Sequence, residues 1–162
     1  MGFNTNIYAN NHLYKDNYKV GLEYEELFYK MLVKLYEKYD NIRVENTEFY
    51  CYKDFNIYKD NELIVQIELK CRLSDTSRFN TLFCDKSKMI EYQYDNDVIQ
   101  SKQKGCFKEF LLINNCLKEN CFYFNSFDKF EIKGFQDIFK KDLIKSNDIN
   151  DIFNYINNLV LT

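Results

Sequence analysis

The sequence predicts a three-layer α/β/α domain built around a central mixed sheet. Three observations support this fold class: a helical pattern near the N-terminus, strand-like alternation in the middle of the chain, and further strand and helix patterns toward the C-terminus. The elements follow one another in the order helix, strands, helix, strands and terminal helices. A mixed sheet with helices on both of its faces accommodates this order best.

The composition predicts one folded domain. The chain has 162 residues, of which 46% are apolar and 18% aromatic, enough for a core rich in Phe and Tyr. No linker, repeat or low-complexity segment divides it. We therefore expect a single domain over residues 1–162, with a core from about 19 to 125 and C-terminal helices from about 134 to 160.

The first helix is predicted from Lys19 to Tyr39, where apolar residues recur three and four positions apart. Asn17 is a candidate N-cap, and Asp40-Asn41 a candidate end point. An acidic run lies in the first turns, where it suits the positive end of the helix dipole. Its members are Glu23, Glu25 and Glu26.

Strand patterns follow this helix. The strongest runs from Glu62 to Leu69 and is preceded by a hairpin turn at Lys59-Asp60-Asn61. Alternation places one set of side chains on each face of this strand. The first set is Leu63, Val65, Ile67 and Leu69, and the second is Ile64, Gln66, Glu68 and Lys70. Shorter strand candidates are Ile42–Val44, Glu48–Tyr52 and Phe55–Tyr58.

The rest of the chain predicts a loop, a second pair of strands and more helices. Residues 74–84 are expected to form the loop. The two strands are joined around Leu117 to Asn120. The strand candidates are Phe107–Ile113 and Cys121–Asn125, and the helix candidates are Asp85–Tyr94, Phe135–Ile144 and Asp148–Leu159.

The cysteines and the single histidine argue against a zinc site. The six cysteines form no Cys-x-x-Cys pair, and His12 is the only histidine. The polar N-terminus lacks a signal-peptide pattern, and no run of about 18 apolar residues is present. We expect reduced thiols in a cytoplasmic, or otherwise intracellular, protein that is not inserted in a membrane. The net charge of -3 argues mildly against a simple basic nucleic-acid binder.

The segment from Asp54 to Lys70 contains the residues that suggest a catalytic site. Glu68 and Lys70 share one face of the strongest strand, and the hairpin returns the chain so that Asp54 can lie beside Glu68. Two carboxylates this close are stable when a cation lies between them. Oxygen ligands without His or Cys favour Mg²⁺ or Mn²⁺. Such an ion and an adjacent lysine suit phosphodiester hydrolysis.

A simpler interpretation remains open at this point. Glu68 and Lys70 could form a solvated strand face or an internal ion pair, worth about 0–1 kcal/mol at a surface. The apolar character of the strand from Leu63 to Leu69 indicates a central strand, where charges usually have a functional reason. The sequence therefore favours the catalytic interpretation.

The arrangement resembles the core of the PD-(D/E)xK nuclease superfamily, which includes restriction-endonuclease-like and Holliday-junction-resolvase-like enzymes. The motif Asp corresponds to Asp54 and the Glu-x-Lys to Glu68-Leu69-Lys70, whereas Asp60 is placed in the turn. The Pro that often precedes the motif Asp is replaced by Lys53. The resemblance covers about residues 19–95 and implies an αβββαβ core. In the helix, Gly21 followed by an acidic residue four positions later favours Glu25 over Glu23 or Glu26.

This resemblance implies a Mg²⁺- or Mn²⁺-dependent nuclease that hydrolyses DNA. The implied catalytic residues are Asp54, Glu68, Lys70 and Glu25, and the implied metal ligands are Asp54, Glu68 and Glu25. A double-strand-cutting enzyme of this kind would usually be a homodimer. RNA cleavage and exonuclease activity are narrower options. The alternative function is a non-catalytic nucleic-acid-binding or protein-interaction domain of the same fold.

Basic residues after the motif strand are candidate contacts for the nucleic-acid backbone. The family often places a basic or amide residue in the helix after the Glu-x-Lys strand, and Lys86 or Lys88 could match it. The full set of candidates is Arg72, Arg78, Lys86 and Lys88.

Overall fold

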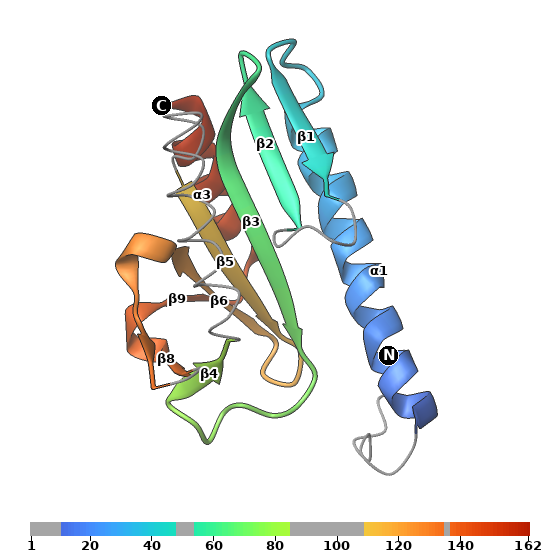
Figure 1. Ribbon diagram of the computed structural model, residues 1–162, viewed down its shortest axis with the longest axis vertical. Coiled ribbons are helices and arrows are strands. Elements are labelled where there is room, and N and C mark those ends of the chain that lie inside the picture. The colour runs from blue at the N-terminus through green and yellow to red at the C-terminus, as the bar shows by residue number, and fades with distance from the viewer. Residues whose placement is uncertain (1–10, 48–53, 85–108, 135–136) are drawn as a thin grey trace.

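The structure, a computed structural model, describes residues 11–47, 54–84, 109–134 and 137–162. Within these ranges the chain is a mixed α/β fold, with two α-helices, a six-stranded sheet and a small three-stranded sheet (Figure 1). The α-helices are α1 (Asn11–Tyr36) and α3 (Ile149–Leu161), and short 3₁₀ helices cover Phe127–Lys129 and Lys140–Asp142.

The six-stranded sheet has the order β1-β2-β3-β5-β6-β9. β3 and β5 pair in parallel at its centre, and all other neighbouring strands pair antiparallel. The sheet is therefore mixed, as the sequence predicts. Its strands are β1 (Ile42–Asn46), β2 (Phe55–Lys59), β3 (Glu62–Arg72), β5 (Glu109–Cys116), β6 (Cys121–Ser126) and β9 (Ile144–Ser146).

The hairpin between β2 and β3 confirms the predicted turn. Asp60 and Asn61 have φ values of 53° and 65°, the left-handed pair that a tight two-residue hairpin turn requires. The Asp60 N–H also donates to the Asn41 carbonyl at 2.8 Å. A register shift next to the turn pairs Ile57 with Val65 but Tyr58 with Leu63. Ile64 is the extra residue, and it joins the helix-side core instead of the opposite face that strict alternation predicts.

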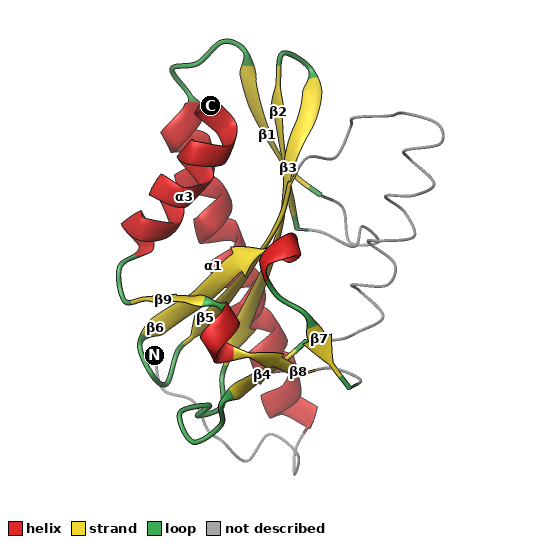
Figure 2. Ribbon diagram, turned by 90° about the vertical axis from the view of Figure 1, so that its left-hand side faces the viewer, coloured by secondary structure: helices red, strands yellow, loops and turns green. Residues whose placement is uncertain are grey.

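Both α-helices lie on one face of the six-stranded sheet (Figure 2). The Phe28 ring of α1 stacks on the Phe153 ring of α3, with centroids 5.5 Å apart. The Tyr36 hydroxyl donates to Asn157 Oδ1 at 2.6 Å. These contacts join the first and last helices of the chain over one apolar core. The sheet residues of this core are Phe55, Ile57, Ile64, Val65, Ile67, Leu111, Ile113 and Phe124.

The other face of the sheet carries a second apolar cluster, which is closed by the small sheet β4-β8-β7. Leu82 and Ile138 pair across this small sheet and point into the cluster. On β5, Leu112 belongs to this cluster, whereas its neighbours Leu111 and Ile113 belong to the helix-side core. β5 is therefore apolar on both faces, as a central strand should be. The strands of the small sheet are β4 (Thr81–Phe83), β7 (Ile132–Lys133) and β8 (Asp137–Phe139).

The predicted helix over Phe135–Ile144 is wrong. From residue 137 the chain forms β8, a 3₁₀ helix and the start of β9. The apolar residues Ile138, Phe139 and Leu143 do fall at helix-like spacings, which explains the prediction. Pairing of β8 with β4 and β7 supplies backbone partners that a local pattern does not reveal.

Other boundaries also differ from the prediction. The first helix starts at Asn11, so Asn17 lies inside α1 and is not its N-cap. The predicted loop over residues 74–84 contains β4. The last helix is confirmed, with Asp148 as its N-cap accepting the Asn150 N–H at 2.9 Å. Two predicted elements, Glu48–Tyr52 and Asp85–Tyr94, lie outside the described residues.

Within the described ranges, neither α-helix combines the length and the apolar character needed to cross a membrane.

A first prediction concerns the helix-side core. Leu32 is 0% exposed, and we expect Leu32→Ala to lower the free energy of unfolding by about 2–5 kcal/mol, because it leaves a cavity between α1 and the sheet. Urea denaturation followed by circular dichroism measures this change. The matched control is Val33→Ala, since Val33 is 38% exposed and should change stability by about 0.5 kcal/mol or less. Equal losses in both variants would contradict the described core.

Candidate active site

A row of polar side chains lies along β3 on the face that carries the small sheet. In the parallel pair, Glu68 is the register partner of Leu112, which belongs to the cluster on that face. The Arg72 guanidinium contacts the side chain of Asn114, the register partner of Lys70. Alternation then places Gln66, Glu68, Lys70 and Arg72 on one face, as the sequence predicts for the first three of them.

Glu68 is a buried charged residue on the central strand β3. Its side chain is 2% exposed, and the Lys70 ammonium lies 3.3 Å from its Oε1. A carboxylate taken out of water needs compensating charge or hydrogen bonds. Lys70 supplies charge from one side while its own side chain, 29% exposed, reaches toward solvent. The pair is therefore not a solvated strand face; it is the internal ion pair that the simpler interpretation also allowed.

Asp54 flanks the position of Glu68 from the neighbouring chain segment. The Asp54 N–H donates to the Ile67 carbonyl at 2.9 Å, and the Asp54 carboxylate accepts the Leu69 N–H at 2.8 Å. These two bonds reach the residues on either side of Glu68. Thr47, just after β1, donates its N–H and its hydroxyl to the Asp54 carbonyl. The structure thus brings Asp54 beside the Glu-x-Lys segment, as the sequence predicts.

Glu25 approaches this region from α1, on the helix side of the sheet. Burial raises the pKa of the Cys71 thiol to about 12, and the negative charges of Asp54 and Glu25 add to this effect, while Arg72 opposes it. Both carboxylates therefore act on the same thiol at the end of β3. Glu25 is half-buried, whereas Glu26 is exposed and pairs with Lys30 at 3.3 Å.

The helix that carries Glu25 packs on one face of the sheet, whereas Glu68 belongs to the opposite face. Among the residues that the structure describes, no three His, Cys, Asp or Glu side chains gather closely enough to hold a metal ion. The three-carboxylate set of Asp54, Glu68 and Glu25 stays a prediction. The two carboxylates beside Lys70 still fit the donor chemistry of Mg²⁺, which commonly takes one or two protein carboxylates and fills its other positions with water and substrate phosphate.

Arg72 ties three strands together. Its Nε and one terminal nitrogen donate to Asn114 Oδ1 at 3.0 and 2.8 Å, and the same nitrogen donates to the Phe83 carbonyl. Burial lowers the pKa of this guanidinium, and neighbouring thiols and Glu68 oppose that effect. The contacts connect β3, β5 and β4. Sequence reasoning missed Asn114, a fully buried amide, because nothing local distinguishes it from other asparagines.

The other basic candidates lie farther along the chain. Arg78 is exposed, and its guanidinium carbon lies 5.3 Å from the centre of the Phe79 ring. Lys86 and Lys88 lie outside the described residues. The contacts of all four basic candidates with nucleic acid stay predictions.

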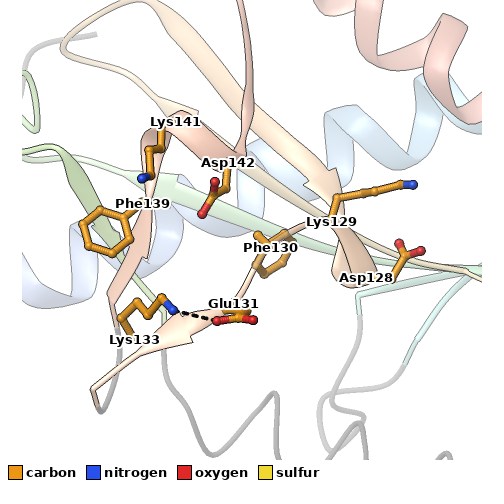
Figure 3. A pocket seen from close by; sticks show the side chains of 8 residues that line it. All are labelled: Asp128, Lys129, Phe130, Glu131, Lys133, Phe139, Lys141 and Asp142. Atoms are coloured by element: carbon orange, nitrogen blue, oxygen red, sulfur yellow. Dashed lines mark hydrogen bonds and ion pairs between the residues drawn. The ribbon is translucent and has the colours of Figure 1, made fainter.

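A hollow of about 360 Å³ lies elsewhere, over the small sheet and the 3₁₀ helices (Figure 3). Lysine and carboxylate side chains alternate around it, and Lys133 pairs with Glu131 at 2.7 Å. Its charges therefore largely cancel, and it shares no residue with the polar row on β3. The lining residues are Asp128, Lys129, Phe130, Glu131, Lys133, Phe139, Lys141 and Asp142.

Comparisons with known proteins add no assignment. No family model matches the chain, and a search of curated proteins finds no match either.

A second prediction tests the buried pair. We expect Lys70→Met to lower the free energy of unfolding by about 1–3 kcal/mol, because it leaves the Glu68 carboxylate without its ammonium partner. The range lies below that for fully buried pairs because Lys70 is partly exposed. The double variant Glu68→Gln/Lys70→Met should recover most of the loss, and Lys141→Met, at an exposed lysine, serves as the control. Strictly additive single and double changes would contradict the pair.

A third prediction concerns alkaline pH. Burial raises the pKa of the Cys116 thiol to about 11, above its value in the unfolded chain, so the native state retains this proton longer. The stability that results is present below the unfolded pKa and is lost as the pH rises toward 11. We expect the urea midpoint to fall between pH 8 and pH 10, and to fall less in Cys116→Ala. An identical decrease in both proteins would exclude Cys116 as a source of the effect.

Proposed function

We propose that the chain is a Mg²⁺-dependent nuclease that hydrolyses phosphodiester bonds, with DNA as the first substrate to test. The observation that supports this most directly is the position of Asp54 against the segment Ile67–Leu69, beside the buried Glu68 and its partner Lys70. Two carboxylates and a lysine, carried by neighbouring segments at a central strand, are the groups that metal-assisted phosphodiester hydrolysis uses.

Asp54 and Glu68 would hold the ion, which supplies Lewis-acid stabilisation of the phosphate and a more acidic water when bound. Lys70 has a partly exposed ammonium beside Glu68, so it can hold the attacking water or offset charge on the phosphate. The Leu69 N–H holds the Asp54 carboxylate in place. Glu25 would act from the helix side as a further acidic residue near Asp54.

We infer further that the fold is the three-layer, restriction-endonuclease-like arrangement. The described order α1, β1, β2, β3 and the parallel strand β5 supports the αβββαβ core, in which a helix precedes the last strand. The expected helix, Asp85–Tyr94, would lie between β3 and β5 in the sequence. A right-handed crossover between parallel strands usually contains such a helix. A homodimer remains the expected form of a double-strand-cutting enzyme.

The fourth prediction tests this activity. Supercoiled plasmid, linear duplex, single-stranded DNA, a four-way junction and RNA are incubated with the protein in Mg²⁺, Mn²⁺ or EDTA. We expect metal-dependent cleavage that falls by roughly 100-fold or more in Asp54→Ala and in Lys70→Ala. The matched controls are Glu62→Gln and Lys141→Ala, which change an exposed acid on the same strand and an exposed lysine.

Cleavage that survives EDTA, or that persists in Asp54→Ala and Lys70→Ala, would refute the proposed mechanism. Calorimetry with Mn²⁺ gives a second measurement, because Glu68→Gln should weaken metal binding while the fold survives. A Glu68→Gln protein that fails to fold would instead favour the internal ion pair. Wild-type protein that binds nucleic acid without cutting it would favour the alternative, a non-catalytic binding domain.

A further inference from the structure

Two large aromatic side chains lie on the surface just after β3. Phe79 is 54% exposed and Phe83 is 52% exposed. Scattered apolar residues on a surface need no explanation, but these two belong to one short segment that begins where the candidate active site ends. The residues around Phe79 and Phe83 therefore indicate whether the exposure of these two rings serves a function.

The segment that carries Phe79 is held in place by its contacts with the rest of the protein. The Thr76 N–H donates to Glu119 Oε1 at 2.7 Å, and the Thr76 hydroxyl donates to the same oxygen. The Lys140 ammonium donates to the Thr76 carbonyl at 2.7 Å, and the Lys140 N–H donates to the Asn80 carbonyl at 2.8 Å. These bonds fix the backbone on both sides of Phe79. The exposed ring is thus presented from an anchored loop.

Phe83 lies next to the polar row of β3. Its carbonyl accepts a hydrogen bond from the Arg72 guanidinium. Arg72 and Lys70 share one face of β3 and are two residues apart, a spacing of roughly 7 Å along a strand. A substrate strand whose phosphate lies at Lys70 would therefore pass close to Phe83.

The charge beside Phe79 indicates the kind of partner. The Arg78 guanidinium carbon lies 5.3 Å from the centre of the Phe79 ring, and both side chains are exposed. Hydrogen bonds from the Ser77 side chain and from the Ser77 N–H lower the pKa of the nearby Asp75 carboxyl, and the charge of Arg78 adds to this effect. A purely apolar partner would take the Arg78 guanidinium and the nearby Asp75 carboxylate out of water, which is unfavourable. A nucleotide offers an aromatic face for the ring and a phosphate for the guanidinium.

We propose that Phe79 and Phe83, together with Arg78, form a stacking surface for unpaired bases of the nucleic acid on which the candidate active site acts. In a duplex the base faces are covered by neighbouring base pairs, so stacking on a protein ring requires bases that are single-stranded or displaced. The substrate class is therefore nucleic acid with unpaired nucleotides beside the bond that is cut. This inference rests on the proposed function, because it assumes that a substrate phosphate lies at Lys70.

Binding in EDTA tests the surface without any cleavage. The probes are a fluorescein-labelled single-stranded oligonucleotide of 15 nucleotides and the corresponding duplex, and anisotropy gives the affinity. We expect the double variant Phe79→Ala/Phe83→Ala to bind the single strand roughly 5- to 100-fold more weakly. Duplex affinity should change by less than about 3-fold, because duplex binding depends mainly on phosphate contacts. Leu27→Ala, at an apolar residue that is 53% exposed on α1, is the matched control.

A second readout detects stacking directly. The chain contains no Trp, so the Phe79→Trp variant carries a single indole at the proposed surface. We expect this variant to retain single-strand affinity and its indole fluorescence to be quenched by the oligonucleotide. An unquenched indole at saturating oligonucleotide would overturn the proposal.

Three further results would overturn it: unchanged single-strand affinity in the double variant, an equal loss for single strand and duplex, or a wild-type dimer that the double variant dissociates. The last result would identify the two rings as an interface between copies of the chain. The proposed nuclease function fails separately, if wild-type protein binds single strands through these rings and cuts none of the substrates in Mg²⁺ or Mn²⁺.

Discussion

The Glu68 carboxylate, buried beside the Lys70 ammonium on a central strand, constrains the rest of this structure. A charge in that position must be compensated, and β3 itself supplies the cations Lys70 and Arg72. Asp54 is held beside Glu68 by backbone bonds, and Arg72 is held on the same face by Asn114. Charged groups are thereby concentrated toward one end of β3, while apolar clusters pack on both faces of the sheet.

The parallel pairing of β3 with β5 makes this concentration of polar groups possible. β5 contributes apolar residues to both faces, so the centre of the sheet is stabilised by burial on both sides. The two helices close one face, and the small sheet closes part of the other. The hydrogen bonds of Arg72 to Asn114 and to the Phe83 carbonyl join the small sheet to the end of β3. The segment that follows β3, with its two exposed aromatic residues, is consequently anchored to the end of that strand.

Local sequence patterns predicted the structure correctly where a segment belongs to a single hairpin, strand or helix. The β2–β3 hairpin, the alternation of Glu68 and Lys70 against Ile67 and Leu69, and the last helix were all predicted and are all present. The pattern failed over Phe135–Ile144, where helix-like spacing coincides with residues that pair in two different sheets. The predicted face of Ile64 was also wrong, because the register shift next to the turn moves this residue to the other face of the sheet.

The sequence by itself determined the mixed strand and helix content, the position of the motif hairpin, and the expectation that Asp54, Glu68 and Lys70 act together. Each of these depends on neighbours along the chain. Only the tertiary structure decided that Arg72 binds Asn114 and the Phe83 carbonyl, that α1 and α3 share one face, and that Glu68 belongs to the other face. The physical reason is that these relations join residues brought together by strand order and packing, and side-chain periodicity carries no information about either.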